Sequence, residues 1–234
     1  MYKYVVSDGG KEWEVFRFPF ELVDSNMFFL PSGNTGIVID PNENDELLEV
    51  FGKYGTRRIL IVLTHEHYDH TIGVEWLQSK IDSWLFCHKA CADAIATEKG
   101  NNPKTLAILL TIRDAADGGH RRDEFMATAK RYVLKADETF DSFRELTVGG
   151  IDLICYPTPG HSKGSAIYFL GDKCVFTGDS LIQHTPTILK LPGSDKEVFQ
   201  NITKPFLKSL DKKKMVFPGH GEPFRLGEAD YLYK

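Results

Sequence analysis

Short runs rich in β-branched and aromatic residues alternate with turn residues at the start of the chain. The runs cover residues 2–7, 13–18, 27–30 and 37–39, and turn residues such as Gly9, Pro31 and Gly33 separate them. β-Branched and aromatic side chains favour strands, whereas glycine and proline mark turns. The pattern therefore predicts an antiparallel sheet in this part of the chain.

A second pattern follows, in which helical spacing alternates with continuous aliphatic runs. Leu47, Leu48 and Phe51 recur at helical spacing in residues 45–54, and residues 58–63 then form an unbroken aliphatic run. Such a run is typical of a strand that is buried on both faces. We expect further helices at 71–80, 89–97 and 196–210, and further strands at 83–87, 151–156, 166–170, 173–177 and 215–217. The mixture predicts a layered α/β fold in a single domain, residues 1–234.

Residues 101–145 interrupt this alternation. Residues 106–110 and 124–134 read as helix, and the first of these segments is too apolar to be left in water. We therefore expect the insertion to pack on the body of the domain as a helical lid or wall over an active site. Its acidic and basic residues are nearly balanced, so Arg121-Arg122 and Lys130-Arg131 are expected on a solvated face rather than in a phosphate site.

Composition limits the function classes. The 234 residues are 42% hydrophobic and 26% charged, and the net charge of -5 provides no general attraction to nucleic acid. No signal peptide or membrane-spanning run is recognisable, so we expect a cytoplasmic protein without a membrane or nucleic-acid partner. The oligomeric state is not predicted. The four cysteines are expected to be reduced thiols, and Cys87 and Cys91 are expected to pack in the core rather than form half of a zinc site.

The strongest chemical signal follows the aliphatic run 58–63. There the chain reads Thr-His-Glu-His-Tyr-Asp-His, which places His65, His67, Asp69 and His70 within six residues. Imidazole and carboxylate suit zinc and related transition metals, and residues two apart at a strand end can point to the same side. Asp69 alone could be a helix N-cap, but that explanation leaves three clustered histidines unaccounted for. The cluster predicts a metal site.

Three later strand ends each add one more candidate metal ligand. They are T-P-G-H-S around His161, T-G-D-S around Asp179 and P-G-H-G around His220. Each follows an aliphatic or aromatic run and contains glycine or proline, which places a polar side chain on a sharp turn. Each alone could be an ordinary turn, but with the first cluster they strengthen the metal prediction. His88 and His120 are expected to be structural or exposed.

These motifs resemble the motif series of the metallo-β-lactamase fold superfamily, and most closely that of its glyoxalase II-like, or hydroxyacylglutathione hydrolase-like, enzymes. The resemblance runs from Asn26 to about Gly227, apart from the insertion. It implies an αββα sandwich of two mixed sheets with helices outside and the metals at one edge. It also implies two divalent metal ions, of which zinc is favoured and iron or manganese are suited. The implied ligands are His65, His67 and His161 for one ion, Asp69, His70 and His220 for the other, and Asp179 as a bridge.

The implied activity is hydrolysis of a small molecule. A hydroxide shared by two metals can attack a carbonyl carbon while the metals polarise the carbonyl, and Asp69 is placed to receive or pass on a proton. A small thioester, lactone or other ester fits this chemistry best. A phosphodiesterase or nuclease of the same fold is an alternative. Such an enzyme would favour a basic channel, which the composition does not show. A persulfide dioxygenase-like oxidoreductase with one iron is a further alternative, and the full ligand set argues against a non-catalytic metal-binding module.

Two departures from the family pattern concern the substrate. Many glyoxalase II-like members carry an arginine-containing Gly-Ser-rich stretch after the bridging aspartate, and residues 183–187 stand in its place here. We also expect no C-terminal helical domain for binding glutathione after His220. Both weaken the expectation of a glutathione thioester. We expect His184 to contact substrate beside the metals. An apolar acyl part would meet Phe28, Phe29, Tyr68 and the aliphatic residues of the insertion. A polar or anionic end would meet Lys163, His184 or an arginine of the insertion.

Overall fold

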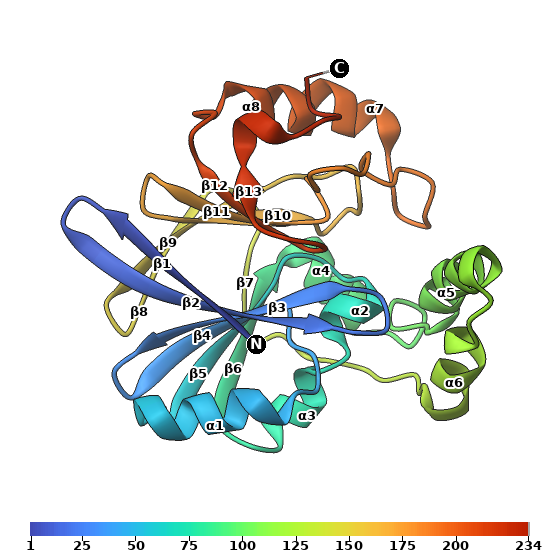
Figure 1. Ribbon diagram of the computed structural model, residues 1–234, viewed down its shortest axis with the longest axis horizontal. Helices are drawn as coiled ribbons and strands as arrows, with labels where there is room; N and C mark the ends of the chain where they lie inside the picture. The colour runs from blue at the N-terminus through green and yellow to red at the C-terminus, as the bar shows by residue number, and fades with distance from the viewer. Residues whose placement is uncertain (234) are drawn as a thin grey trace.

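Two β-sheets face each other at the centre of the molecule, with helices on the outside (Figure 1). The computed structural model describes residues 1–233. The first sheet has the strand order β1-β2-β3-β4-β5-β6-β7 and the second has the order β13-β12-β11-β10-β9-β8. This αββα sandwich is the architecture that the family resemblance implied, and it agrees with the layered α/β fold that the pattern predicted.

The first sheet is antiparallel at its beginning and parallel from β4 onward. Ile59 to Leu63 are fully buried, because Leu60 and Val62 face the second sheet whereas Ile59 and Ile61 pack under the outer helices. The aliphatic run is thus buried on both faces, as predicted. The strands are β1 (Tyr2–Asp8), β2 (Lys11–Phe20), β3 (Ser25–Ser32), β4 (Thr35–Ile39), β5 (Arg58–Leu63), β6 (Asp82–His88) and β7 (Glu138–Phe140).

The second sheet is antiparallel apart from the parallel pair β11 and β12. Its inner face meets the first sheet in an aromatic cluster, in which the Phe28 ring lies 5.3 Å from that of Phe176 and 5.5 Å from that of Phe217. The strands are β8 (Arg144–Val148), β9 (Ile151–Pro157), β10 (Ala166–Leu170), β11 (Cys174–Gly178), β12 (Met215–Pro218) and β13 (Phe224–Arg225).

The expected substrate contacts of Phe28 and Phe29 are wrong. Both side chains are buried, at 2% and 0% exposure, because β3 is an inner strand covered on both faces. Phe28 points into the layer between the sheets, and Phe29 packs against Phe51 with ring centroids 4.9 Å apart. Their role is therefore in the core.

Helices cover the outer face of each sheet. Figure 1 shows α1 (Asp45–Tyr54) and α3 (Val74–Gln78) outside the first sheet, and α7 (Lys196–Val198) and α8 (Lys204–Ser209) outside the second. A π-helical turn, η1 (Phe199–Thr203), joins α7 to α8 and completes the helix predicted at 196–210. The remaining elements of the body are α2 (Tyr68–Thr71), α4 (Lys89–Ile95) and a 3-10 turn, η2 (Leu226–Glu228).

The helix predicted at 71–80 is broken at Gly73. The Gly73 N–H donates to the carbonyl of Pro41 at 2.9 Å, and a Cβ at this position would lie only 2.5 Å from the Asn42 backbone. The chain therefore passes close to the loop after β4 here, and α2 and α3 form as two short helices instead of one.

The insertion consists of α5 (Lys104–Asp117) and α6 (Arg121–Thr128), which lie side by side at one end of the molecule (Figure 1). Leu106, Leu110 and Phe125 pack with Val23 and Tyr68 of the body. The insertion is thus anchored through an apolar cluster, as its composition predicted.

Two expectations about the insertion are wrong. Residues 129–134 are not helical, because the chain turns to extended backbone at Ala129 and carries Leu134 into the core, where its N–H donates to the carbonyl of Ile95. Residues 138–145 are not part of the insertion either, because they include β7 and the start of β8. The added segment therefore spans residues 101–137.

All four cysteines are free and buried among apolar side chains, as predicted. Within residues 1–233, no helix combines the length and the apolar character needed to cross a lipid bilayer.

Candidate metal centre

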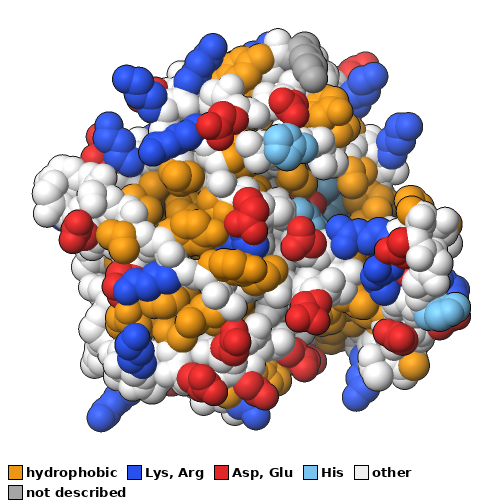
Figure 2. Space-filling model, in the orientation of Figure 1, with side chains coloured by type: hydrophobic (Ala, Val, Ile, Leu, Met, Phe, Trp, Pro, Cys, Tyr) orange, Lys and Arg blue, Asp and Glu red, His pale blue; other side chains and the backbone are white. Residues whose placement is uncertain are grey.

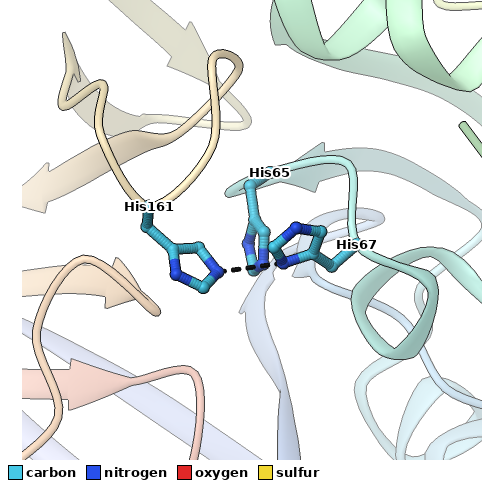
Figure 3. Close-up of side chains that lie close together, drawn as sticks. All are labelled: His65, His67 and His161. Atoms are coloured by element: carbon cyan, nitrogen blue, oxygen red, sulfur yellow. Dashed lines mark hydrogen bonds between the residues drawn. The ribbon is translucent and has the colours of Figure 1, made fainter. Parts of the chain in front are cut away.

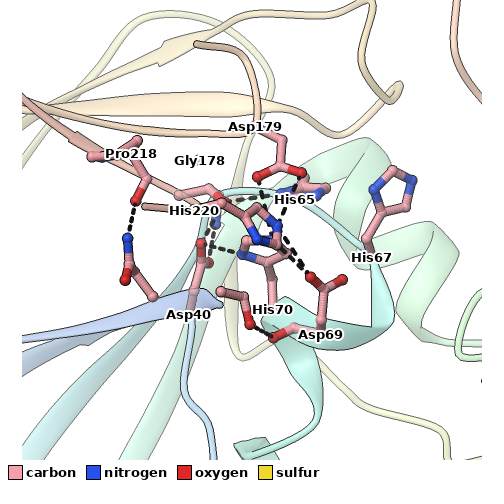
Figure 4. A network of polar contacts seen from close by, with 12 residues as sticks. Asp40, His65, His67, Asp69, His70, Gly178, Asp179, Pro218 and His220 are labelled. Atoms are coloured by element: carbon pink, nitrogen blue, oxygen red, sulfur yellow. Dashed lines mark hydrogen bonds and ion pairs between the residues drawn. The ribbon is translucent and has the colours of Figure 1, made fainter. Parts of the chain in front are cut away.

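The seven predicted ligands come together at one edge of the sandwich, where four segments of chain end or turn. Figure 4 shows six of them, and Figure 3 shows the seventh, His161. The segment after β5 carries His65, His67, Asp69 and His70. The turn after β9 carries His161, and the ends of β11 and β12 carry Asp179 and His220. Residues distant in sequence therefore meet because their strands end at the same edge.

His65, His67 and His161 form the first group (Figure 3). One ring nitrogen from each lies within 4.8 Å of the others, and His67 Nδ1 is 2.9 Å from His161 Nε2. A tetrahedral zinc ion with bonds of about 2.0–2.1 Å separates two nitrogen ligands by roughly 3.3 Å. The three rings are therefore spaced closely enough to share one ion.

Asp69, His70 and His220 form the second group. Asp69 Oδ2 lies 3.3 Å from His220 Nε2 and 3.4 Å from His70 Nε2. Asp179 lies between the groups, because its carboxylate is 3.6 Å from His161 Nε2 and 3.4 Å from His70 Nε2. The same carboxylate is 3.5 Å from His220 Nε2. Asp179 is thus the residue that contacts both groups.

Several buried ligand atoms of this cluster make no hydrogen bond. His65 Nε2, His70 Nε2 and Asp179 Oδ1 are buried and make no hydrogen bond in the part of the chain that the structure describes. A buried polar atom without a partner costs about 1–3 kcal/mol, so such atoms are rare unless something binds them. The imidazole and carboxylate set suits zinc, iron and manganese. The residues present therefore fit divalent metal ions.

The pKa shifts favour the metal-binding forms of most candidate ligands but the protonated forms of His70 and His220. Burial lowers the pKa of His65 well below its ordinary value and that of His67 to about 3, which keeps both imidazoles neutral. Burial raises the pKa of Asp69, but His70 and His220 outweigh this effect and hold it at about 2. Burial lowers the pKa of His220, but Asp179 and Asp69 raise it to about 10. A metal bound by His220 must therefore displace a proton.

Asp40 supports the cluster and was not predicted. Its Oδ2 atom lies 2.9 Å from His70 Nδ1 and accepts the Thr64 hydroxyl at 2.6 Å, and its Oδ1 atom accepts the Thr64 N–H at 2.7 Å. Because the Thr64 hydroxyl donates to Asp40, it can accept from His65 Nδ1, which is 3.0 Å away. The Nε2 atoms of His65 and His70 are thereby left free for the cluster. The sequence signal was slight: an aspartate between a predicted strand and Pro41.

Other contacts fix the remaining rings. His161 Nδ1 lies 2.9 Å from the carbonyl of Ile188, and His220 Nδ1 lies 3.1 Å from that of Val23, which directs both Nε2 atoms to the cluster. Glu66 joins two ligand segments, because its carboxylate accepts the Ser162 hydroxyl at 2.8 Å. The candidate ligands are thus held in place from several elements.

Gly219 explains the P-G-H-G motif. A Cβ at this position would lie 2.2 Å from Asp179 Oδ1 and 3.0 Å from the His70 ring, both of which are fixed by their surroundings. Only glycine lets β12 end close enough to place His220 beside Asp69.

A cavity of about 250 Å³ opens over the cluster. Figure 2 shows histidine atoms in a hollow next to the insertion, with Lys or Arg atoms beside it. One wall comes from α5, one from residues 182–191, and the base from the cluster. The lining residues are Val23, His67, Tyr68, Asp69, Thr105, Leu106, Leu109, Ile112, Arg113, Asp179, Ile182, Thr185, Ile188, Leu191 and His220. A larger cavity of about 960 Å³ on the other side of Tyr68 contains none of the seven candidate ligands.

The structure corrects the expected position of His184. Its side chain is 72% exposed and pairs with Asp230 at 2.9 Å, and it does not line the cavity over the cluster. Lys163 is exposed and also lies outside that lining, whereas Tyr68 belongs to it. His88 accepts the N–H of Ala90 at the start of α4, and His120 is exposed, which agrees with their expected roles.

Chelation of the metal is expected to lower the melting temperature of the purified protein. Metal that binds only the folded state adds about 4 kcal/mol when its concentration is 1,000 times the dissociation constant. In a domain of this size, that corresponds to roughly 8–16 °C. Thermal unfolding with and without chelator, and after metal is restored, measures the shift. An unchanged melting temperature in protein shown to have lost its metal would contradict the site.

Comparisons with known proteins agree with this geometry. A sequence model described as Metallo-beta-lactamase superfamily matches residues 21–220. A probable metallo-hydrolase of Streptococcus pyogenes is 26% identical over 210 residues, which cover 89% of this chain and 84% of that protein. A hydroxyacylglutathione hydrolase of Xanthomonas campestris is 26% identical over 199 residues, which cover 84% of this chain but 61% of that protein.

Solved structures share the fold. The B3 metallo-β-lactamase BLEG-1 superposes with a TM-score of 0.72 at 21% identity, covering 92% of this chain and 95% of that one. The protein TTHA1623, crystallised in a di-iron-bound form, superposes with a TM-score of 0.66 at 25% identity, covering 91% of this chain and 95% of that one.

Proposed function

The chain belongs to the metallo-β-lactamase superfamily, and from this premise we propose that it is a dinuclear metal-dependent hydrolase that cleaves a small thioester, lactone or other ester. The observation that carries the proposal is the position of Asp179, which contacts His161 of the first group and His70 and His220 of the second. One carboxylate within reach of two ligand groups can bridge two metal ions held about 3.5–4 Å apart.

We propose zinc as the metal, held by His65, His67 and His161 on one side and by Asp69, His70 and His220 on the other. Iron and manganese accept the same donors and are alternatives. The di-iron form of TTHA1623 is a precedent for two metals in a related fold.

Divalent ions in this site would lower the pKa of coordinated water toward about 7 and polarise a substrate carbonyl. The described lining of the cavity contains no serine or cysteine, and its side-chain hydroxyls belong to Thr105, Thr185 and Tyr68. Asp69 lines the cavity as an ionised carboxylate, which places it to receive a proton and pass it to the leaving group. The aliphatic walls exclude water from the acyl part of the substrate.

The alternatives fit the cavity less well. A phosphodiesterase or nuclease needs a basic surface to bind its substrate, and Arg113 is the one basic side chain that the described lining adds to the histidines. A persulfide dioxygenase-like enzyme with one iron would use only part of the ligand set. The acyl hydrolase is therefore the preferred function, with a small molecule as the partner.

Metal analysis followed by a substrate panel tests this proposal. Protein loaded with zinc, iron or manganese is assayed on aliphatic thioesters, lactones and p-nitrophenyl esters, and on bis-p-nitrophenyl phosphate. We expect two metal ions per chain and turnover of at least one acyl class. Cleavage of the phosphodiester without any acyl turnover would indicate a phosphodiesterase. One bound iron per chain together with consumption of oxygen would indicate a dioxygenase.

A further inference from the structure

The side chains of α5 that line the cavity become more exposed to solvent from the start of the helix toward its end. Leu106 is 1% exposed and packs with Val23 and Tyr68 near the cluster, Leu109 is half-buried, and Ile112 is 63% exposed. All three line the cavity at helical spacing, so they form one continuous apolar strip. The cavity thus leads from the candidate ligands along an aliphatic wall to solvent.

Arg113 lies at the exposed end of this strip. Within the lining it is the only charged side chain apart from the candidate ligands. It makes no hydrogen bond or ion pair with the residues that the structure describes. Other arginines of the insertion are paired, for example Arg121 with Asp117 at 2.7 Å and Arg122 with Asp123 at 2.6 Å. An unpaired guanidinium therefore stands at the mouth of an apolar cavity.

We propose that Arg113 determines specificity by binding an anionic group at the far end of the substrate's acyl chain, while the apolar part of the chain lies against α5. The proposal rests on the acyl hydrolase function proposed above. A guanidinium offers paired N–H donors that match a carboxylate or phosphate, and next to an apolar wall such a bond is stronger than in water. Within the lining, no other cation outside the cluster is available to an anion.

The length of the substrate follows from the helix. Leu106 and Arg113 are seven residues apart, which corresponds to about 10 Å along the axis at a rise of about 1.5 Å per residue. The cavity of about 250 Å³ admits only a slender ligand. The substrate class is therefore a short aliphatic acyl compound with a terminal carboxylate or phosphate, rather than a bulky or neutral one.

Matched substrates test this inference. The panel contains N-acetylcysteamine thioesters of hexanoate, adipate and 6-phosphonohexanoate, which share one chain length and differ in the terminal group. They are assayed with metal-loaded wild-type protein, Arg113→Gln, Arg113→Lys and the control Arg122→Gln, which removes the same charge from an exposed position outside the cavity.

We expect wild-type protein to prefer an anionic thioester, and the two anionic substrates to show whether carboxylate or phosphate is bound. Arg113→Gln should lower kcat/KM for that substrate about 10- to 100-fold, mainly through KM, as loss of a charged hydrogen bond predicts. It should leave the hexanoyl thioester unchanged. Arg113→Lys should recover part of the loss, and Arg122→Gln should behave as wild type.

Equal use of the neutral and anionic thioesters by wild-type protein and Arg113→Gln would overturn the role of Arg113 and leave the acyl hydrolase intact. Failure of every thioester with wild-type protein would count against the proposed function instead. Calorimetric binding of adipate, 6-phosphonohexanoate and hexanoate distinguishes the two failures, because it needs no turnover. Tighter binding of an anion-terminated acid by wild-type protein than by Arg113→Gln supports the anion site, and equal binding overturns it.

Discussion

Asparagine in place of Asp179 is expected to abolish hydrolysis and to weaken metal binding in both ligand groups together. Asp179 lies 3.4–3.6 Å from histidine nitrogens of both groups, so one substitution would remove a charged candidate ligand from each. Loss of an outer partner of a ligand already costs about 10- to 100-fold, and loss of a shared ligand should cost more. Elemental analysis after metal loading, together with kcat/KM on the best acyl substrate, measures both effects.

Two variants make this prediction specific. His67→Ala removes a ligand from the first group only, so it should lose one metal preferentially along with nearly all activity. Asp123→Asn removes a carboxylate from an exposed position in α6 and should retain both metals and full activity. If a fully active enzyme held a single tightly bound metal, the two-metal site would be refuted.

Alanine in place of Asp40 is expected to reduce metal affinity about 10- to 100-fold and to lower the free energy of unfolding as well. The variant leaves the Thr64 N–H, the Thr64 hydroxyl and His70 Nδ1 without their carboxylate. Each buried polar group left unpaired costs about 1–3 kcal/mol. Metal titration and chemical denaturation of the metal-free protein separate the two effects.

Asp40→Asn separates orientation from stability. Asparagine tolerates the left-handed backbone at this position, where φ is 52°, and its amide oxygen can still accept the Thr64 N–H. Its amide NH₂ would face His70 Nδ1, which would place the remaining imidazole proton on Nε2 and block that atom as a ligand. We expect wild-type stability within about 1 kcal/mol but weakened metal binding. Undiminished metal affinity in this variant would show that Asp40 does not orient His70.

The sequence predicted the strands and the clustering of the candidate ligands because both depend on local pattern. The aliphatic run of β5 and the turn motifs around His161, Asp179 and His220 are readable without knowing what lies opposite them. Asp40 was missed because its partners Thr64 and His70 are 24 and 30 residues away, and only the pairing of β4 with β5 brings them together.

The wrong predictions for His184 and for residues 129–134 also arose because contacts between residues distant in the sequence decide the local structure. His184 follows Asp179 closely in sequence, but the chain between them turns outward, and His184 pairs with Asp230 near the end of the chain. Residues 129–134 have helical composition, yet the backbone is extended because Leu134 returns to the core beside Ile95.

The cytoplasmic location stays a prediction.

The candidate metal ligands and the proposed substrate-binding residues of the insertion lie in different parts of the chain. The candidate metal ligands are spread over four segments from His65 to His220, so a change in one segment disturbs contacts made by the others. The aliphatic strip and Arg113 instead belong to a single helix, α5, within an insertion that rejoins the body at Leu134. Natural variation or recombination can therefore exchange residues 101–137 as a unit and give an unchanged catalytic edge a new choice of substrate.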